Sequence, residues 1–373
     1  MRKLKVTVIS MDAVPNYGSV LQAFATKNIF EKYECDVTFV DYAREDVRYD
    51  NLSKTWSNGN PIKSLIMMPT IRRWKKVFRR FREDNLNLTE HQYTSDEDFN
   101  KHVLVSDIFC TGSDQVWNSK WNHGIIRPLY LSFAPKESMK IAFSASFGQD
   151  RLQEEEINAT KALINEYRYI SVREESAVRI LKEQYGYKNA IHVLDPTLMI
   201  SGNEWRNYAP KVSKAKPYIL IYNLNRSKEF DKYAKELSKR TGLELVRFCT
   251  RYDQFYRPGK SLFIPEVFEF ISLIDNAKYV LTDSFHATAF SMNMHTEPIC
   301  VYPKEFGGRI ESFLKLTKSE NCHIRSYNDF DVLNGSVDFS EVDKIVEKER
   351  HKANVWLEKV LQDAVEYQRD YEV

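Results

Sequence analysis

Short apolar runs alternate along the chain with amphipathic helical patterns. The first three segments are KVTVISM (5–11), SVLQAFATKNIFEKY (19–33) and DVTFVDY (36–42), which read as strand, helix and strand. Further strands are predicted at 107–112, 140–146, 169–172 and 191–195. Because helical patterns lie between several of these strands, we expect a mostly parallel sheet covered by helices on both faces.

A second α/β series follows a polar stretch that ends near residue 216. Its predicted strands are 218–224, 244–250, 278–283 and 298–303, and its predicted helices are 227–241 and 265–276. The pattern predicts two Rossmann-like doubly wound α/β domains, at 1–205 and 216–339, and a C-terminal helix over 340–373 that returns toward the first domain. This is the architecture of GT-B type transferases, an inference by fold-level analogy.

Composition narrows the class of protein. The 373 residues, 43% of them hydrophobic, suffice for two ordinary domains. No long apolar run is present and an aspartate interrupts the N-terminal apolar segment, so we expect a cytoplasmic protein without a membrane span or an export signal. The five cysteines are scattered singly, which predicts reduced core residues, and a net charge of +2 does not by itself indicate a nucleic-acid partner. Dinucleotide-binding, P-loop and zinc-binding motifs are absent, and we expect no metal site.

Polar side chains are concentrated just after the predicted strands, where open α/β sheets bind ligands. After the first strand, an ordinary tight turn and a ligand site are equally compatible with the sequence, and Ser19 is expected to cap the next helix. The strand that ends in TGSDQVWN offers hydroxyl and carboxylate groups for sugar hydroxyls and a tryptophan ring for stacking. We favour a ligand role there over an aspartate-capped helix with a core tryptophan. The candidate residues of the two turns are Asn16, Tyr17, Gly18, Ser113, Asp114, Gln115, Trp117 and Asn118.

Arg173 follows a predicted strand directly and precedes a helix that Glu174 and Glu175 open. An arginine at a helix N-terminus opposes the helix dipole, so we expect it to have an anionic partner. That partner is either a neighbouring glutamate in an ion pair or a bound carboxylate or phosphate held by the guanidinium fork. The sequence leaves both alternatives open.

His286 lies in the first turn of the helix that follows the strand YVLT. Phe285, Ala289 and Met292 form the apolar face of this helix, and His286 lies off that face. A lone histidine is more often structural than catalytic. A histidine that points toward the strand ends, however, could give or take one proton.

Seven motifs occur in this order: NYGSVLQ, TGSDQVWN, SVREES, VLDPTLM, YILIYNL, TDSFHATAFSM and GGRIESFLKL. With these motifs at compatible spacing over almost the whole chain, the sequence resembles the polysaccharide pyruvyl transferase family. The resemblance implies a GT-B-like enzyme that moves a pyruvyl group from phosphoenolpyruvate to a sugar of a bacterial surface polysaccharide or of its lipid-linked precursor. The product is commonly a ketal on two hydroxyls, and phosphate is released.

The resemblance also implies roles for single residues. It places the donor phosphoenolpyruvate at Arg173 in the first domain and at four residues of the second, namely Ser284, Phe285, His286 and Arg309. The first domain would bind the acceptor through its two polar turns. Ser284 and Phe285 stand where variants of the family carry a charged residue and a leucine before the histidine, a departure that bears on the shape of the donor pocket.

The chemistry of such a reaction suits these residue types. Phosphoenolpyruvate is a small trianion, so it needs cations and free backbone amides, and Arg173 and Arg309 would supply the cations. We expect His286 to protonate the enol methylene carbon as the general acid and Asp114 to accept the proton of the attacking hydroxyl as the base. The scheme uses no metal and no cofactor.

One segment is strongly basic. Seven of the eleven residues from 72 to 82 are basic, while Ile71, Trp74, Phe78 and Phe81 recur at helical spacing. We favour a surface helix whose aromatic stripe packs on the core. The alternative is that residues 71–82 contact the anionic inner leaflet of the membrane, which would suit a lipid-linked acceptor. A nucleic-acid partner is the weakest reading, since the charge of the chain is nearly balanced.

Two other functions fit the same pattern. A GT-B glycosyltransferase that uses a nucleotide sugar shares the order of strand, T-D-S, helix and E-P-I. A non-catalytic glycan-binding or anion-binding protein on this fold is the second alternative. Turnover of phosphoenolpyruvate separates both from a pyruvyltransferase.

Overall fold

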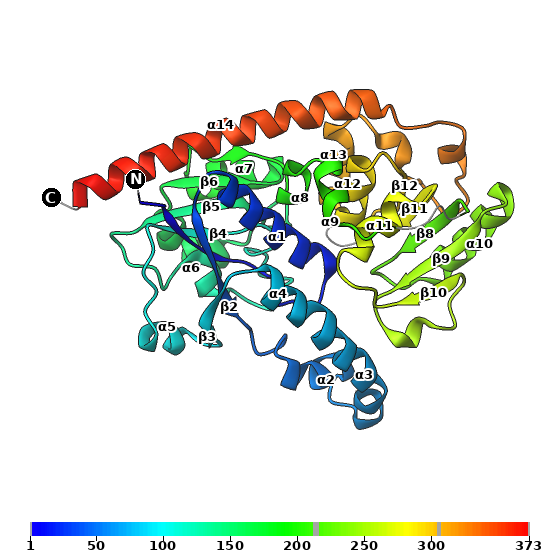
Figure 1. Cartoon of the computed structure of the whole chain (residues 1–373), viewed down its shortest axis with the longest axis horizontal. Helices are drawn as coiled ribbons and strands as arrows, with labels where there is room; N and C mark the ends of the chain where they lie inside the picture. Colours follow the sequence, from blue (N-terminus) through cyan, green and yellow to red (C-terminus); the bar gives the residue numbers. More distant parts are fainter. Residues whose placement is uncertain (1, 212–215, 304–306, 372–373) are drawn as a thin grey trace. The chain divides into compact units, whose positions relative to one another are not determined.

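Two parallel sheets organise the chain (Figure 1). The structure is a computed structural model that describes residues 2–211, 216–303 and 307–371. The chain divides into two units, of which the first comprises residues 1–51, 78–199 and 348–373 and the second comprises 52–77 and 200–347. Each unit contains one of the sheets.

The sheet of the first unit has seven parallel strands in the order β3-β2-β1-β4-β5-β6-β7. The strands are β1 (Lys5–Ile9), β2 (Asp36–Tyr42), β3 (Leu88–Tyr93), β4 (Ile108–Thr111), β5 (Met139–Ala145), β6 (Tyr169–Val172) and β7 (Ile191–His192). All seven residues of β5 are buried, as expected for a central strand that helices cover on both faces. The strand order reverses between β1 and β4, which marks the edge where the loops of a doubly wound sheet form ligand sites.

The helices of the first unit are α1 (Tyr17–Lys32), α4 (Arg80–Asn85), α5 (Asp96–Lys101), α6 (Glu154–Ile164), α7 (Glu175–Ile180) and α8 (Pro196–Met199). Asn16, rather than the predicted Ser19, caps α1, because its side-chain oxygen accepts from the Gly18 and Ser19 amides at 2.8 and 3.3 Å. The helix therefore begins two residues earlier than the apolar pattern indicated. This places the Ser19 side chain inside the first turn, where it is free to serve another partner.

The second unit contains a five-stranded parallel sheet in the order β10-β9-β8-β11-β12. Its strands are β8 (Tyr218–Tyr222), β9 (Glu244–Cys249), β10 (Lys260–Phe263), β11 (Tyr279–Thr282) and β12 (Glu297–Cys300). Its helices are α2 (Tyr49–Ser57), most of which lies in this unit, α3 (Pro61–Trp74), α9 (Gly202–Tyr208), α10 (Lys228–Thr241), α11 (Glu269–Asp275), α12 (Phe285–Asn293) and α13 (Gly308–Leu316). The order again reverses beside the first strand, between β8 and β11.

Residues 52–77 pack within the second unit, although the sequence had assigned them to a domain of residues 1–205. The Trp74 indole donates to the Thr250 carbonyl at 2.8 Å, and the Arg73 guanidinium donates to the Ile264 carbonyl at 3.0 Å. Both carbonyls lie just after strands, β9 and β10. The apolar face of α3 thus covers strand exits of the second sheet, a packing that periodicity along α3 does not encode.

The aromatic stripe of the basic segment is buried, as the favoured reading of the sequence required. Ile71, Trp74, Phe78 and Phe81 are all at most 7% exposed. Arg82, at the end of the segment, is also buried and forms ion pairs of 2.7 Å with Asp12 and 2.8 Å with Asp41.

The last helix, α14 (Phe339–Tyr371), contributes to both units. Its first turns belong to the second unit, where Lys318 pairs with Glu341 at 2.9 Å. From residue 348 on it belongs to the first unit, where the Trp356 ring stacks on Phe143 with centroids 6.2 Å apart. The C-terminal helix therefore returns to the first unit as the sequence predicted.

All five cysteines are free thiols in buried positions. Burial raises the pKa of the Cys35 thiol to about 11, so that side chain stays protonated at neutral pH. Among the described residues, no helix is both long and apolar enough to cross a membrane.

Candidate functional site

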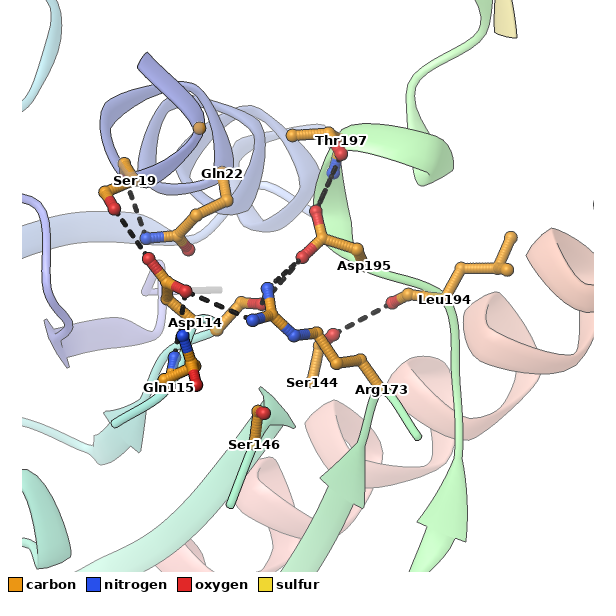
Figure 2. A network of polar contacts seen from close by, with 12 residues as sticks. Ser19, Gln22, Asp114, Gln115, Ser144, Ser146, Arg173, Leu194, Asp195 and Thr197 are labelled. Atoms are coloured by element: carbon orange, nitrogen blue, oxygen red, sulfur yellow. Dashed lines mark hydrogen bonds and ion pairs between the residues drawn. The ribbon is translucent and has the colours of Figure 1, made fainter. Parts of the chain in front are cut away.

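Arg173 is the centre of a buried polar network at the carboxyl ends of the first sheet (Figure 2). Its Nη1 atom donates to Asp195 Oδ2 at 2.6 Å, and its Nη2 atom donates to Asp114 Oδ1 at 3.1 Å. Glu174 Oε2 lies 3.8 Å from the guanidinium Nε atom. Only 1% of the Arg173 side chain is exposed. Arg173 therefore has carboxylate partners within its own chain, chiefly two aspartates from distant turns rather than the neighbouring glutamate that the sequence offered.

The carboxylates around Arg173 keep its guanidinium group protonated. Burial opposes the charged form of Arg173, but the carboxylates of Asp195, Asp114 and Glu174 outweigh that effect and raise the pKa of Arg173 above its ordinary value. A guanidinium that grips two carboxylates of its own chain is held as a permanent cation. The network therefore determines where the guanidinium lies and does not change its charge.

Asp114 links the network to helix α1. Its Oδ2 atom accepts from the Ser19 hydroxyl at 2.6 Å, and its Oδ1 atom accepts from the Gln115 amide at 2.9 Å as well as from Arg173. The Asp114 backbone has a φ of 80°, a left-handed conformation that a non-glycine residue adopts at a cost. Both carboxylate oxygens therefore already have donors, which does not suit the role of a free base that the sequence suggested.

Asp195 was not singled out as a site residue from the sequence. It follows β7, and its Oδ1 atom accepts from the Thr197 amide at 3.0 Å and from the Thr197 hydroxyl at 2.7 Å (Figure 2). Its second oxygen is then aimed at Arg173. The signal that could have identified it is its place in VLDPTLM, an aspartate between a strand and a helix-opening proline.

Glu174, next to Arg173, is held by two donors from the loop that follows β5. Ser146 donates to Glu174 Oε1 at 2.6 Å, and the Gly148 amide donates to the same oxygen at 3.2 Å. Gly148 has a φ of 60°, and a Cβ atom there would come within 2.3 Å of Gln115 Oε1 and 2.6 Å of Asn118 Nδ2. A glycine is therefore favoured where this loop passes the turn after β4.

The turn residues proposed as acceptor ligands are brought together, but most are enclosed. Trp117 is fully buried, its indole donates to the Leu129 carbonyl at 3.1 Å, and its ring packs on Tyr130. The stacking face expected for a sugar is thus a core contact, which corrects that part of the prediction. Tyr17 is likewise buried, with its ring 4.9 Å from Phe78. Ser113 and Asn118 are fully buried, whereas Asn16 remains partly exposed as the cap of α1.

In the second unit, the residues carried over by resemblance lie together at the start of α12. Ser284 is the N-cap of this helix and accepts from the Ala287 amide at 3.4 Å. The next two residues, Phe285 and His286, have ring centroids 5.3 Å apart, and His286 is 7% exposed. From α13, the Arg309 guanidinium carbon lies 5.8 Å from the centre of the Phe285 ring. One cation and one imidazole thus flank the same aromatic ring, at the helix N-terminus that follows β11.

Asp283 holds the neighbouring loop against this helix start. Its carboxylate accepts from the amides of Leu224 at 2.7 Å and Asn225 at 2.8 Å, and from the Asn223 side chain at 2.9 Å. Burial raises the pKa of Asp283 above its ordinary value, although these donors oppose the shift. Sequence reasoning missed this role. The signal in the sequence was an aspartate between the end of β11 and the N-cap of α12. β11 lies next to β8, which leads into the loop that Asp283 binds.

Among the described residues, no three His, Cys, Asp or Glu side chains are grouped so that they could hold a metal ion. The cations of the two clusters described above are arginines, and they lie in different units. Arg173 belongs to the first unit and Arg309 to the second.

Comparisons with solved structures identify the fold. No curated protein is similar to the chain in sequence. UDP-N-acetylglucosamine 2-epimerase from Rickettsia bellii has a TM-score of 0.55 at 12% identity, over 99% of this chain and 98% of that one. The spinosyn forosaminyltransferase SpnP has a TM-score of 0.53 at 9% identity, over 98% of this chain and 100% of that one. These likenesses concern the fold alone and confirm a GT-B-like arrangement of two doubly wound α/β domains.

The sequence match is more specific than the likeness of fold. The family described as polysaccharide pyruvyl transferase matches residues 16–305, which include the Arg173 network and the start of α12. The chain therefore belongs to the polysaccharide pyruvyl transferase family.

Proposed function

We propose that the protein transfers a pyruvyl group from phosphoenolpyruvate to a sugar of a bacterial surface polysaccharide or of its lipid-linked precursor. The observation that carries this proposal is the grouping of Ser284, Phe285, His286 and Arg309 at the start of α12. A small organic phosphate needs a cation, helix-terminal amides and a proton donor close together, and this grouping offers all three.

In the proposed site, Arg309 neutralises the donor and His286 acts on its enol carbon. A protonated His286 gives its proton to the methylene carbon, and the central carbon becomes electrophilic as the double bond is lost. A sugar hydroxyl adds to that carbon and releases its proton. The second hydroxyl then forms the other C–O bond and gives its proton to the leaving inorganic phosphate, so the acceptor gains the atoms of pyruvate less one water. Phosphoenolpyruvate is the donor substrate, and the scheme uses no cofactor.

Arg173 and Asp114 enter this proposal as positioning residues. Because their charges neutralise each other at 3.1 Å in a buried network, they support the shape of the strand exits in the first unit. The acceptor is proposed to contact the exposed rim of these exits, which includes Asn16. We place the reaction in the cytoplasm, and the base that receives the hydroxyl proton is left unassigned.

The decisive experiment measures phosphate release from phosphoenolpyruvate by the purified chain, with a panel of galactosides, mannosides and lipid-linked saccharides as acceptors. The expected result is acceptor-dependent phosphate release together with a product heavier by pyruvate less one water. Thermal stabilisation by a nucleotide sugar but not by phosphoenolpyruvate would instead identify a glycosyltransferase. Stabilisation by glycans or anions without any turnover would identify a binding protein.

A further inference from the structure

An exposed apolar surface lies on α2 and α3 of the second unit. Trp56, Ile62, Leu65 and Ile66 are 46%, 71%, 74% and 58% exposed. The last three share one face of α3, because they are spaced three and four residues apart. Aliphatic side chains are rarely presented to water in such a row, so this face needs an explanation. We call it the α2–α3 surface.

The opposite face of α3 is already packed, so the exposed row is not a misplaced core. Met67, Thr70, Ile71 and Trp74 are buried against the same unit. The Thr70 hydroxyl accepts from the Tyr252 amide at 3.2 Å. Helix α3 is thus fixed by one face and presents the other outward.

The charges within the segment that contains this surface have a single sign. From residue 51 to residue 82 the sequence contains no Asp or Glu and nine Lys or Arg. Four of the nine form ion pairs with acidic residues outside this range: Arg73 with Glu266, Arg82 with Asp12, and Arg79 and Arg80 with Glu83 and Asp84, which follow the segment directly. Five basic residues are exposed and form no ion pair with any described residue: Lys54, Lys63, Arg72, Lys75 and Lys76. An apolar row bordered by unneutralised cations is the result.

We propose that the α2–α3 surface docks on an anionic lipid bilayer. Ile62, Leu65 and Ile66 would enter the boundary between headgroups and acyl chains, while the basic side chains lie at the level of the lipid phosphates. Charge complementarity favours this occupant, and the apolar row argues against a purely ionic polymer such as nucleic acid. Docking uses residues 54–76 rather than the aromatic stripe of 71–82, whose rings are buried. It does not depend on the reaction proposed above.

The test is flotation of the full chain with phosphatidylcholine vesicles that contain or lack phosphatidylglycerol. The wild type is expected to float with the anionic vesicles and to stay in solution with the neutral ones. Leu65→Gln/Ile66→Gln should weaken binding to anionic vesicles by about tenfold or more. Arg72→Gln/Lys75→Gln/Lys76→Gln should weaken it by about fivefold for each charge removed.

Two matched controls carry the same chemical changes elsewhere. Lys232→Gln/Lys235→Gln/Lys239→Gln removes three exposed charges from α10, and Val103→Gln/Val105→Gln replaces two exposed aliphatic side chains. Neither control should change flotation, and none of the variants should change the melting temperature. The proposal fails if the wild type does not bind anionic vesicles or if a control weakens binding as much as its counterpart. It also fails if Leu65→Gln/Ile66→Gln abolishes self-association but not flotation, since the surface would then be an interface between copies of the chain.

Discussion

The Arg173 guanidinium and the Asp195 carboxylate form a charge-assisted hydrogen bond of 2.6 Å, and at most 1% of either side chain is exposed. Such a pair is costly to break from one side, because the remaining charge stays buried without its partner. The pair joins the exits of β6 and β7 and, through Asp114, reaches helix α1. It is therefore a fixed point of the first unit.

Arg173→Met is expected to lower the free energy of unfolding by about 3–5 kcal/mol, since it leaves buried carboxylates without a counter-charge. Urea denaturation followed by circular dichroism measures the loss. Arg79→Met breaks an exposed pair with Glu83 and should cost less than about 1 kcal/mol. If Arg173→Met kept its stability and only raised the KM for phosphoenolpyruvate, Arg173 would be a donor ligand rather than a positioning residue.

His286→Gln is expected to abolish phosphate release while leaving the fold intact, because glutamine cannot deliver the proton in the proposed step. His295→Gln is the matched control. His295 lies two residues after the end of α12, is exposed, and its Nε2 atom is 2.9 Å from Asp343. That variant should retain wild-type turnover. Turnover by His286→Gln at the wild-type rate would remove the imidazole from the mechanism.

Arg309→Gln is expected to raise the KM for phosphoenolpyruvate by about tenfold to a hundredfold, the cost of losing a hydrogen-bonded charge against the donor phosphate. Lys315→Gln, on the same helix, loses only an exposed pair with Glu311 and should not change the KM. Steady-state phosphate release at varied donor concentration separates the two. Equal effects from both variants would mean that helix α13 acts through general charge and not through Arg309.

The stability of the first unit should fall as the pH is lowered below neutrality. Burial lowers the pKa of His192 below its ordinary value, and Lys352 acts in the same direction, while Glu175 at 3.6 Å and Glu349 at 3.9 Å oppose the shift. The unfolded chain then binds more protons, so stability is complete above the unfolded pKa near 6.5 and is lost as the pH falls through the folded pKa.

Melting temperatures between pH 7.5 and pH 5.5, about one unit on either side of the ordinary histidine pKa, test this expectation. The melting temperature of His192→Gln should decline less over that pH range than the melting temperature of the wild type. A steeper decline in the variant would show that protonated His192 stabilises the fold through its glutamates.

Gly148→Ala is expected to destabilise the protein by more than about 1 kcal/mol, because the added methyl group meets Gln115 and Asn118 and the backbone φ is positive. Gly186→Ala tests the conformation without the collision, since Gly186 has a φ of 76° and a methyl group added there would have no atom of the described residues within 4 Å. The difference between the two free energies of unfolding isolates the steric effect. Equal losses of stability in the two variants would mean that Gln115 and Asn118 move aside for the added methyl group at no cost.

Much of the fold follows from the sequence, because buried parallel strands are continuous apolar runs. The stretches at β5, β8 and β11 are of this kind, and the structure confirms them as strands. β3 and β10 escaped prediction because they lie at sheet edges and are partly exposed, so their sequences LTEHQY and KSLF are mixed. Edge strands contain fewer apolar residues in a row, and the prediction of strands depends on such runs.

The candidate site was less readable than the fold. Position after a strand singled out Asp114 and Arg173 separately, one for the acceptor side and one for the donor, whereas the structure joins them in one cluster because parallel strands end at a common edge. It could not show that these polar groups bind one another, nor that Trp117 turns inward to the core. Which side of a turn a side chain takes depends on neighbours far away in the sequence, such as Asp195 and Leu129.

The two units are interleaved along the chain, and this ordering constrains how the polypeptide can mature. The first unit is completed only by residues from 348 onward, after the whole of the second has been translated. Until Trp356 has been synthesised, Phe143 of β5 and Tyr169 of β6 therefore lack an aromatic neighbour that they have in the folded chain. Chains that end before α14 should consequently expose apolar surface of the first unit that the full-length chain buries.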